Sequence, residues 1–281
     1  FLIEALGAVL LIPVFCRDFG IKGIWMSVFH SISAFCNAGF DILGTTDHTF
    51  VSLTGYSRNI WLNIVIMLLI ITGGIGFLTW EDFYINKFKF KRYRMQSKII
   101  LMTTAILIFL PAIFFFTNDF KMFSGEERTL LSFFQSITTR TAGFNTADMA
   151  LMTESGKAVM IFLMLIGGSP SSTAGGMKTT TFAVLILNAF ATFRNREDAG
   201  AFGRRFDGQV IKNAATIAML YFMLLFFGGI TISVYEGLPV LTCFYEAASA
   251  VGTVGLTLGV TPGLHIISRL ILIALMYLGR V

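Results

Sequence analysis

Three short segments place a glycine beside hydroxyl or amide residues within otherwise apolar surroundings. They read CNAGFD (36–41), TTRTAGFNT (138–146) and GTVGLTLG (252–259), and their glycines are Gly39, Gly143 and Gly255. Glycine readily adopts positive φ, so successive carbonyl groups of such a segment can point the same way. Rings of carbonyl oxygens can replace the water shell of a potassium ion. The three segments are therefore candidate cation-binding loops.

The surroundings of the three segments repeat as well. FHSISAFCNAGFD (29–41) aligns without a gap to YEAASAVGTVGLT (245–257), and FQSITTRTAGFN (134–145) aligns with a one-residue gap. Each copy has an apolar span, a polar linker, a segment of about a dozen residues too short to cross a bilayer, the glycine element and a second span. The order predicts one structural unit used three times.

Composition shows where these units lie. Of the 281 residues, 55% are hydrophobic and 13% are charged, whereas soluble domains carry about 25% charged residues. The runs 60–79 and 210–234 are long enough to cross a bilayer, which takes roughly 17–25 residues, and 99–116 is slightly shorter. The sequence predicts a polytopic helical membrane protein.

Basic residues set the expected orientation. Two linkers between spans, near 87–98 and 194–212, hold 11 of the 21 Lys and Arg residues. The positive-inside rule places such linkers in the cytoplasm, so the three glycine elements lie on the opposite side. The basic linker 87–98 could also contact anionic lipid or a cytosolic partner.

Two structures could explain a break at each glycine element. A tight turn between helices is one. The other is a re-entrant pore loop, in which exposed backbone is tolerated because it lines a watery path. The C-terminal end of a preceding short helix would add negative potential that favours a cation. Three copies in the same context favour the pore loop.

The segment LIGGSPSSTAGGMKTTT (165–181) interrupts another apolar stretch. Proline and glycine weaken a helix interior by about 3 and 1 kcal/mol, so we expect a loop inside the membrane, with a passive helix kink as the alternative. A Walker A loop is excluded because Met177 separates Gly176 from Lys178.

These motifs resemble the Trk/Ktr/HKT superfamily of potassium transporters, and most of all the membrane subunit of the bacterial Ktr system. The resemblance implies an all-α membrane protein of tandem helix–pore loop–helix repeats in a pseudo-fourfold, potassium-channel-like architecture. It also implies a homodimer in the bacterial plasma membrane, with the filter loops facing outside. A cytosolic nucleotide-binding regulatory ring of the RCK/KTN type, binding ATP/ADP or NAD, and sodium-dependent K⁺ uptake are further implied.

By the same resemblance, three sets of backbone carbonyls would bind K⁺. The candidate donors are Asn37, Ala38, Gly39, Thr141, Ala142, Gly143, Thr253, Val254 and Gly255. The intramembrane segment 167–178 would be the gate. Its candidate residues are Gly167, Gly168, Ser169, Pro170, Ser171, Ser172, Thr173, Ala174, Gly175, Gly176 and Lys178, joined by Arg280.

Three cationic side chains have alternative explanations. Arg280 would add a positive barrier below the filter, or it snorkels at the cytoplasmic boundary. Lys178 would act similarly, or it stabilises the loop. Arg140 would brace the third family loop through hydrogen bonds to carbonyls.

The expected organisation follows the family. Residues 1–79 would form its second pore repeat, 80–98 a basic cytoplasmic linker, 99–193 the third repeat, 194–212 another linker and 213–281 a shortened fourth repeat. Because the first repeat is missing and the last apolar stretch is short, we expect the chain to be a fragment. In the family, serine in the first loop accompanies sodium permeation, so a Na⁺-preferring or non-selective pathway is the alternative.

Other classes of function fit poorly. A membrane-embedded hydrolase needs clustered acids and histidines or a serine–base pair within the spans, which contain almost no acids. We therefore expect neither an enzyme nor a nucleic-acid-binding protein. K⁺ is the expected cargo, with Na⁺ as a coupling or activating ion.

Overall fold

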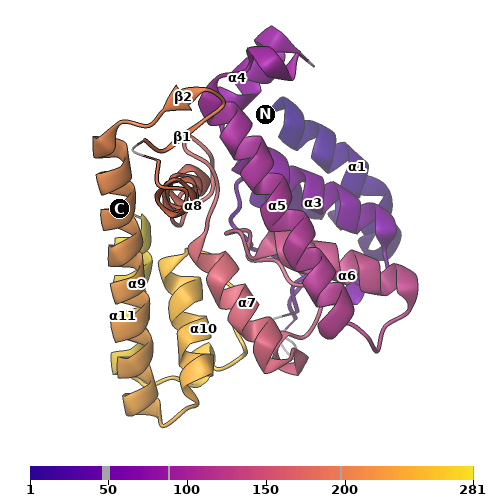
Figure 1. Cartoon of the computed structure of the whole chain (residues 1–281). Helices are drawn as coiled ribbons and strands as arrows, with labels where there is room; N and C mark the ends of the chain where they lie inside the picture. The colour runs from indigo at the N-terminus through magenta and orange to yellow at the C-terminus, as the bar shows by residue number, and fades with distance from the viewer. Residues whose placement is uncertain (46–50, 88, 197, 281) are drawn as a thin grey trace.

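The computed structural model describes residues 1–45, 51–87, 89–196 and 198–280, and its regular structure is almost entirely helical (Figure 1). The helices fall into three successive groups. The first contains α1 (Leu2–Phe19), α2 (Lys22–Phe35), α3 (Ile60–Gly74) and α4 (Phe77–Asn86); the second α5 (Met95–Asn118), α6 (Gly125–Thr138), α7 (Glu154–Leu165) and α8 (Thr179–Phe193); the third α9 (Gly208–Glu236), α10 (Val240–Val251) and α11 (Ile266–Arg280). A small antiparallel hairpin, β1 (Gly200–Ala201) with β2 (Arg204–Arg205), lies in the second basic linker.

Each group has the same order of parts. A first helix packs against a short second helix, in the pairs α1–α2, α5–α6 and α9–α10. The short helices have 14, 14 and 12 residues, about 21 Å at most and too short for a bilayer core of about 30 Å. A loop and a returning helix follow. The predicted all-α architecture of helix–loop–helix repeats is confirmed, apart from the small hairpin.

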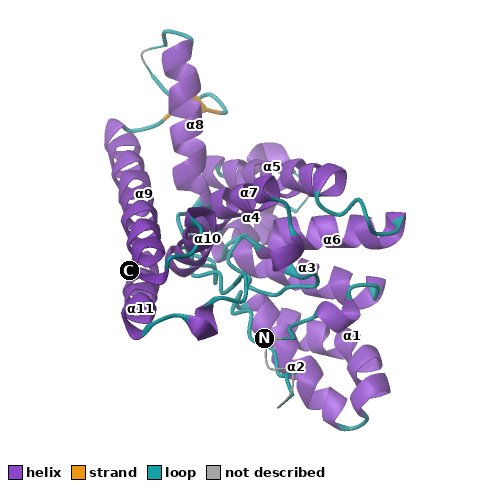
Figure 2. Ribbon diagram, turned by 90° about the horizontal axis from the view of Figure 1, so that it is seen from below, coloured by secondary structure: helices purple, strands orange, loops and turns teal. Residues whose placement is uncertain are grey.

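The loops of the three groups converge. Figure 2 shows loop segments meeting in the middle of the molecule, while α8 projects beyond the other helices. Short single-turn helices, η1 (Thr54–Tyr56), η2 (Phe90–Arg92), η3 (Met149–Leu151) and η4 (Thr261–Gly263), occur in the connections. This convergence brings distant parts of the sequence to one place.

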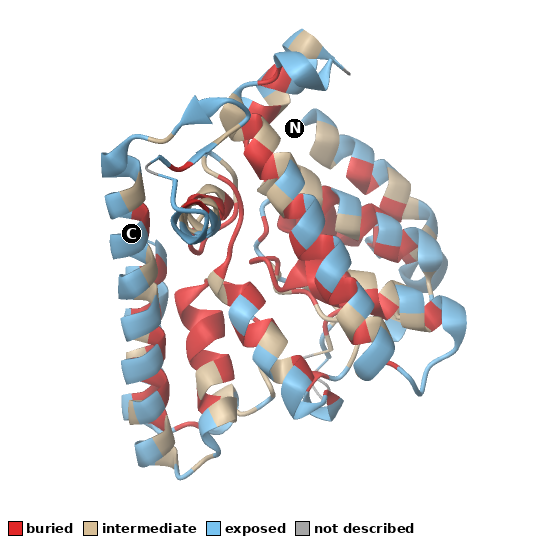
Figure 3. Ribbon diagram, viewed as in Figure 1, coloured by how far each residue is buried: buried red, intermediate tan, exposed pale blue. Residues whose placement is uncertain are grey.

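Large apolar side chains lie on the surface as well as in the hydrophobic core. Among the described residues, α5 (24 residues) and α9 (29 residues) are single helices long and apolar enough to cross a membrane. Their outer faces expose large apolar side chains, such as Leu110 at 66% and Phe227 at 65%, whereas Ser31 and Thr138 on the short helices are fully buried at 0%. Figure 3 shows the buried residues concentrated on the central segments and α9 largely exposed. An apolar exterior, with hydroxyl groups buried on the short helices, suits a lipid environment.

Proline inside α5 is accommodated by the neighbouring short helix. Pro111 has no N–H to donate to the carbonyl of Leu107. The hydroxyl oxygen of Ser136 in α6 lies 3.1 Å from that carbonyl oxygen and 2.7 Å from the carbonyl oxygen of Ile108. The acceptor freed by proline therefore helps to fasten α6 to α5.

The expected continuous span over 60–79 is wrong. Helix α3 ends at Gly74, α4 begins at Phe77, and the two axes bend by 96°. The sequence Gly73-Gly74-Ile75-Gly76 weakens the helix there. The loop after α7 occupies the bend, because Ser169 N donates to Gly74 O and Phe77 N donates to Ser171 O, both at 2.9 Å. We call residues 73–77 the elbow.

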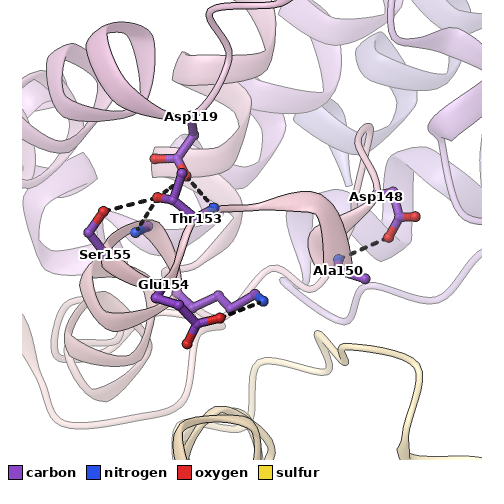
Figure 4. Close-up of polar contacts among 8 residues, drawn as sticks. Asp119, Asp148, Ala150, Thr153, Glu154 and Ser155 are labelled. Atoms are coloured by element: carbon purple, nitrogen blue, oxygen red, sulfur yellow. Dashed lines mark hydrogen bonds and ion pairs between the residues drawn. The ribbon is translucent and has the colours of Figure 1, made fainter.

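A polar cluster joins the C-terminal end of α5 to the N-terminal end of α7. The Oδ1 atom of Asp119 accepts hydrogen bonds from the backbone N (2.9 Å) and the hydroxyl (2.7 Å) of Thr153. Thr153 in turn caps α7 through Gly156 N and lies 3.0 Å from Ser155 Oγ. Figure 4 shows these contacts, with the Asp148–Ala150 turn nearby. The cluster fixes the segment that returns from the second loop.

We expect Gly156→Ala to lower thermal stability, because a methyl group there would collide with the carboxylate of Asp119. Overpacking of this kind costs ~1–3 kcal/mol. Gly125→Ala is the matched control, since it also lies in the first turn of a helix but has no atom within 4 Å of the added carbon. Melting temperatures of the purified variants in detergent check this, and equal values for the two variants would contradict it.

Candidate cation-binding site

The three glycine-containing triads share one backbone conformation. The first and third residue of each triad have positive φ, whereas the middle residues Ala38, Ala142 and Val254 do not. The angles are 51° and 70° at Asn37 and Gly39, 71° and 84° at Thr141 and Gly143, and 54° and 89° at Thr253 and Gly255. Positive φ is uncommon outside glycine. Alternation of its sign turns successive carbonyl groups toward one side of the chain.

Each triad follows the C-terminal end of a short helix. The C-cap residues are Cys36 for α2, Thr139 for α6 and Gly252 for α10. The unpaired carbonyls at a helix C-terminus carry partial negative charge, equivalent to about half an elementary charge. Three such ends therefore make the region of the triads favourable for a cation.

The middle N–H group of each triad is paired with its own short helix. Ala38 N donates to Ser33 O at 2.9 Å, Ala142 N to Thr138 O at 3.0 Å and Val254 N to Ser249 O at 2.8 Å. Within the described ranges, none of the nine triad carbonyls accepts a hydrogen bond from the protein. Buried carbonyls are nearly always paired, so these oxygens are free for a ligand.

The triads lie side by side. A side-chain carbon added to Gly39 would lie 2.9 Å from Gly143 Cα and collide with Ala142 O. One added to Gly143 would lie 3.3 Å from Gly39 Cα and collide with Val254 O. The structure thus brings all three triads together, with the second triad in contact with both the first and the third.

Hydroxyl groups fasten two of the loops beyond the glycine. Ser33 Oγ donates to the carbonyl of Phe40 at 2.8 Å, and Thr138 Oγ1 donates to the carbonyl of Phe144. Ser33 and Thr138 occupy equivalent positions near the ends of α2 and α6. Each ties the residue after the glycine back to its short helix.

The segment 166–178 is a loop, with its two ends tied together. Gly167 N donates to Met177 O at 2.8 Å, and Ile166 and Met177 form an isolated bridge. The loop also contacts the first triad, because Thr173 Oγ1 donates to Phe35 O and accepts from Asn37 Nδ2, both at 2.9 Å. The alternative of a passive helix kink is therefore wrong.

The far side of this loop lies against the third triad. A side-chain carbon on Gly175 would collide with Thr253 Oγ1 and lie 3.3 Å from Arg280 Nη1. Lys178 Nζ donates to Ala174 O at 2.7 Å. Lys178 and Arg280 both line a cavity of about 680 Å³ beneath the loop. The predicted gate residues and the predicted triads are thus in direct contact.

Arg140 does not do what the sequence suggested. It is buried, and its Nη2 atom lies 3.5 Å from Thr104 Oγ1 of α5. Among the described residues its side chain donates to no carbonyl. Arg140 N bonds to Ile137 O, so the residue continues the helical path. Its side chain reaches Thr104 of α5 and lines a small cavity together with Asn37 of the first triad.

Sequence reasoning missed the elbow and the two fastening hydroxyls. The elbow had a signal, because three glycines within four residues of an apolar run predict a break. Ser33 and Thr138 had a weaker one, namely a hydroxyl at the same place in two aligned segments. The glycines do not show which loop would bond to the elbow, and the aligned hydroxyls do not show which carbonyl each would reach.

The arrangement suits a monovalent cation. Neutral carbonyl oxygens and helix C-termini can surround a dehydrated ion without a full opposing charge. In the part of the chain that the structure describes, no three His, Cys, Asp or Glu side chains gather in a group that could hold a metal ion. Backbone oxygens are the ligands that the triads offer to a cation.

Known proteins are similar to this chain in sequence and in fold. The family model TrkH, "Cation transport protein", matches residues 1–116 and 94–281. The potassium/sodium uptake protein NtpJ of Enterococcus hirae is 40% identical over 99% of this chain, and the Ktr system potassium uptake protein B of Bacillus subtilis is 33% identical over 99%. This chain covers 62% and 63% of those proteins, less than two thirds of their length.

The potassium transporter TrkH of Vibrio parahaemolyticus superposes with a TM-score of 0.73 at 19% identity, over 97% of this chain and 60% of that one. This match shows a shared fold. Since the family model spans the described helices from α1 to α11, the chain belongs to the TrkH family of cation transport proteins.

Proposed function

We propose that this protein takes up K⁺ across the bacterial plasma membrane through a selectivity filter of backbone carbonyls. One observation carries the proposal: three adjacent triads alternate in the sign of φ, end three short helices and leave nine carbonyls without protein donors. Oxygens arranged in this way can take the place of the ion's hydration shell. Asn37–Gly39, Thr141–Gly143 and Thr253–Gly255 are the proposed ligands.

The choice of K⁺ rests on two supports. Thr253-Val254-Gly255 matches the threonine-valine-glycine core of potassium-channel filters. The relatives from B. subtilis and E. hirae are named for uptake of potassium and of potassium or sodium. The second name also favours the alternative, a pathway that prefers Na⁺ or does not discriminate.

The loop 167–178 is the proposed gate. It lies against Asn37 of the first triad and Thr253 of the third, so an ion leaving the triads would meet it. Lys178 and Arg280 would add positive charge to the cavity below, a barrier to cations. Small residues let such a loop change conformation at low steric cost.

The assembly is proposed from the family resemblance. We infer a homodimer with one pathway in each protomer, outward-facing triads and a cytosolic regulatory ring that binds ATP/ADP or NAD. The basic linkers support the orientation; they include residues 88 and 197, which lie outside the described residues. Na⁺ is proposed as a coupling or activating ion.

We expect the full-length protein in liposomes to take up ⁸⁶Rb⁺ faster than ²²Na⁺. Excess external K⁺ should compete with Rb⁺ uptake more strongly than excess Na⁺ does. Protein-free liposomes set the background. A Rb⁺ uptake rate no greater than the Na⁺ rate would favour the alternative pathway instead.

We expect Gly143→Ser to weaken K⁺ affinity or selectivity. Its side chain would be strained at φ 84° and would collide with Val254 O of the neighbouring triad. Gly203→Ser is the matched control, because Gly203 has φ 77° and open space in the basic linker. Uptake kinetics as a function of K⁺ concentration measure both variants, and unchanged kinetics in Gly143→Ser would contradict the ligand assignment.

We expect a variant that lacks residues 169–175 to conduct constitutively. The remaining ends can rejoin, because Gly167 N lies 2.8 Å from Met177 O and Thr179 N lies 3.0 Å from Gly168 O. The wild-type protein is the control. Passive Rb⁺ flux is the measurement. If the shortened protein stays folded and monodisperse but loses flux, the gate assignment is wrong.

A further inference from the structure

The short helix of the third group carries a buried acid, Glu246. It lies nine residues before Gly255, in the otherwise apolar stretch CFYEAASAV (243–251), and only 4% of its surface is exposed. A buried carboxyl group is costly unless hydrogen bonds satisfy it. Its partners therefore indicate why an acid is placed there.

Those partners all lie just beyond the third triad. Glu246 Oε1 accepts from Thr257 Oγ1 and from Leu258 N, both at 2.8 Å. Glu246 Oε2 accepts from Thr261 Oγ1 at 2.6 Å. Thr257 Oγ1 also accepts a hydrogen bond from Gly259 N at 3.0 Å. One side chain thus holds residues 257–261, a segment that starts two residues after Gly255.

The other two loops are held differently. Ser33 and Thr138 donate to the residue that follows their glycine, whereas within the described residues the equivalent Ser249 makes no such bond to Leu256. Glu246 aligns with His30 of α2 and Gln135 of α6. His30 bonds to Met26 O and Gln135 to Met160 Sδ, and in the described part of the chain neither bonds to the segment after its own triad.

We propose that Glu246 is a positioning residue that fixes the carbonyls of Thr253, Val254 and Gly255 and thereby sets discrimination between K⁺ and Na⁺. The inference rests on the proposed function. A binding constellation must be held to about 0.5 Å to keep its geometry. A loop released beyond Gly255 can draw its carbonyls inward and accommodate the smaller ion. Glu246 acts through its hydrogen bonds and not as a ligand of the ion.

The test compares two replacements of Glu246. Glu246→Ala removes all three bonds to the segment, and we expect it to lower the ratio of Rb⁺ to Na⁺ uptake about tenfold, equivalent to ~1.4 kcal/mol. Glu246→Gln keeps an oxygen that can accept from Thr257 and Leu258, so its ratio should stay within about twofold of the wild type. The full-length protein in liposomes is used throughout.

The donor side of the contact, Thr257, provides an independent variant. Thr257→Val removes the hydroxyl that donates to Glu246 Oε1, so it should lower the ratio in the same direction as Glu246→Ala. The uptake ratio of the double variant should fall by less than the sum of the two single effects, because both substitutions remove the same hydrogen bond between Thr257 and Glu246. If Glu246→Ala fails to fold, Thr257→Val alone carries the test.

Glu127→Ala is the matched structural control. Glu127 is also a buried acid in a short helix, but it bonds to Arg58 Nε at 3.0 Å and Ser57 Oγ at 3.3 Å, at the opposite end of α6 from its triad. It should lower the melting temperature and leave the uptake ratio unchanged. Loss of the ratio in this variant would mean that general destabilisation, not positioning by Glu246, governs selectivity.

Two further results overturn the inference, and one overturns the proposed function. If the wild type is selective and Glu246→Ala has the same ratio of Rb⁺ to Na⁺ uptake, the positioning role is rejected. An equal loss in Glu246→Gln and Glu246→Ala shows that charge matters instead of hydrogen-bond geometry. A wild type with no Rb⁺ uptake above protein-free liposomes rejects the proposed function itself.

Discussion

Nine triad carbonyls accept no hydrogen bond from the described part of the protein, and oxygens left in this way are costly away from water. The triads are anchored through their middle N–H groups, because Ala38, Ala142 and Val254 donate to the carbonyls of Ser33, Thr138 and Ser249 at the ends of the short helices. Each anchored residue lies between two residues of positive φ, so the backbone changes conformation on either side of the anchored N–H group.

The rest of the fold supports the short helices. Because a helix of 12–14 residues cannot reach both sides of a bilayer, polar groups at its buried surface must find protein partners. Ser136 bonds to carbonyls beside Pro111 of α5, and Ser31 bonds to Glu4 O of α1 at 2.7 Å. Apolar residues are thus left for the lipid-facing surfaces of α5 and α9.

Repetition made the architecture and the triads predictable from sequence. Three aligned segments with the same glycine gave the short helices and their loops, and the glycines and proline that interrupt an apolar stretch gave the position of 167–178. Contacts made between repeats were not predictable. The glycines of the elbow signal a break, but its hydrogen bonds to Ser169 and Ser171 come from another repeat, and the direction of Arg140 depends on where α5 lies. Alignment gives equivalent positions, but Ser249 and Ser33 are equivalent and still bond differently.

The proposed gate is connected to the elbow as well as to the triads. Three backbone bonds join it to residues 73–77, and Thr173 adds side-chain bonds to Phe35 and Asn37. At a net 0.5–1.5 kcal/mol each, five such bonds hold the loop by about 3–7 kcal/mol. A regulator that opened the gate would need a comparable difference in affinity for the two states. Helix α4 leads from the elbow to the first basic linker, and its first residue, Phe77, donates its N–H to Ser171 O of the loop, so a displacement of α4 would reach the proposed gate directly.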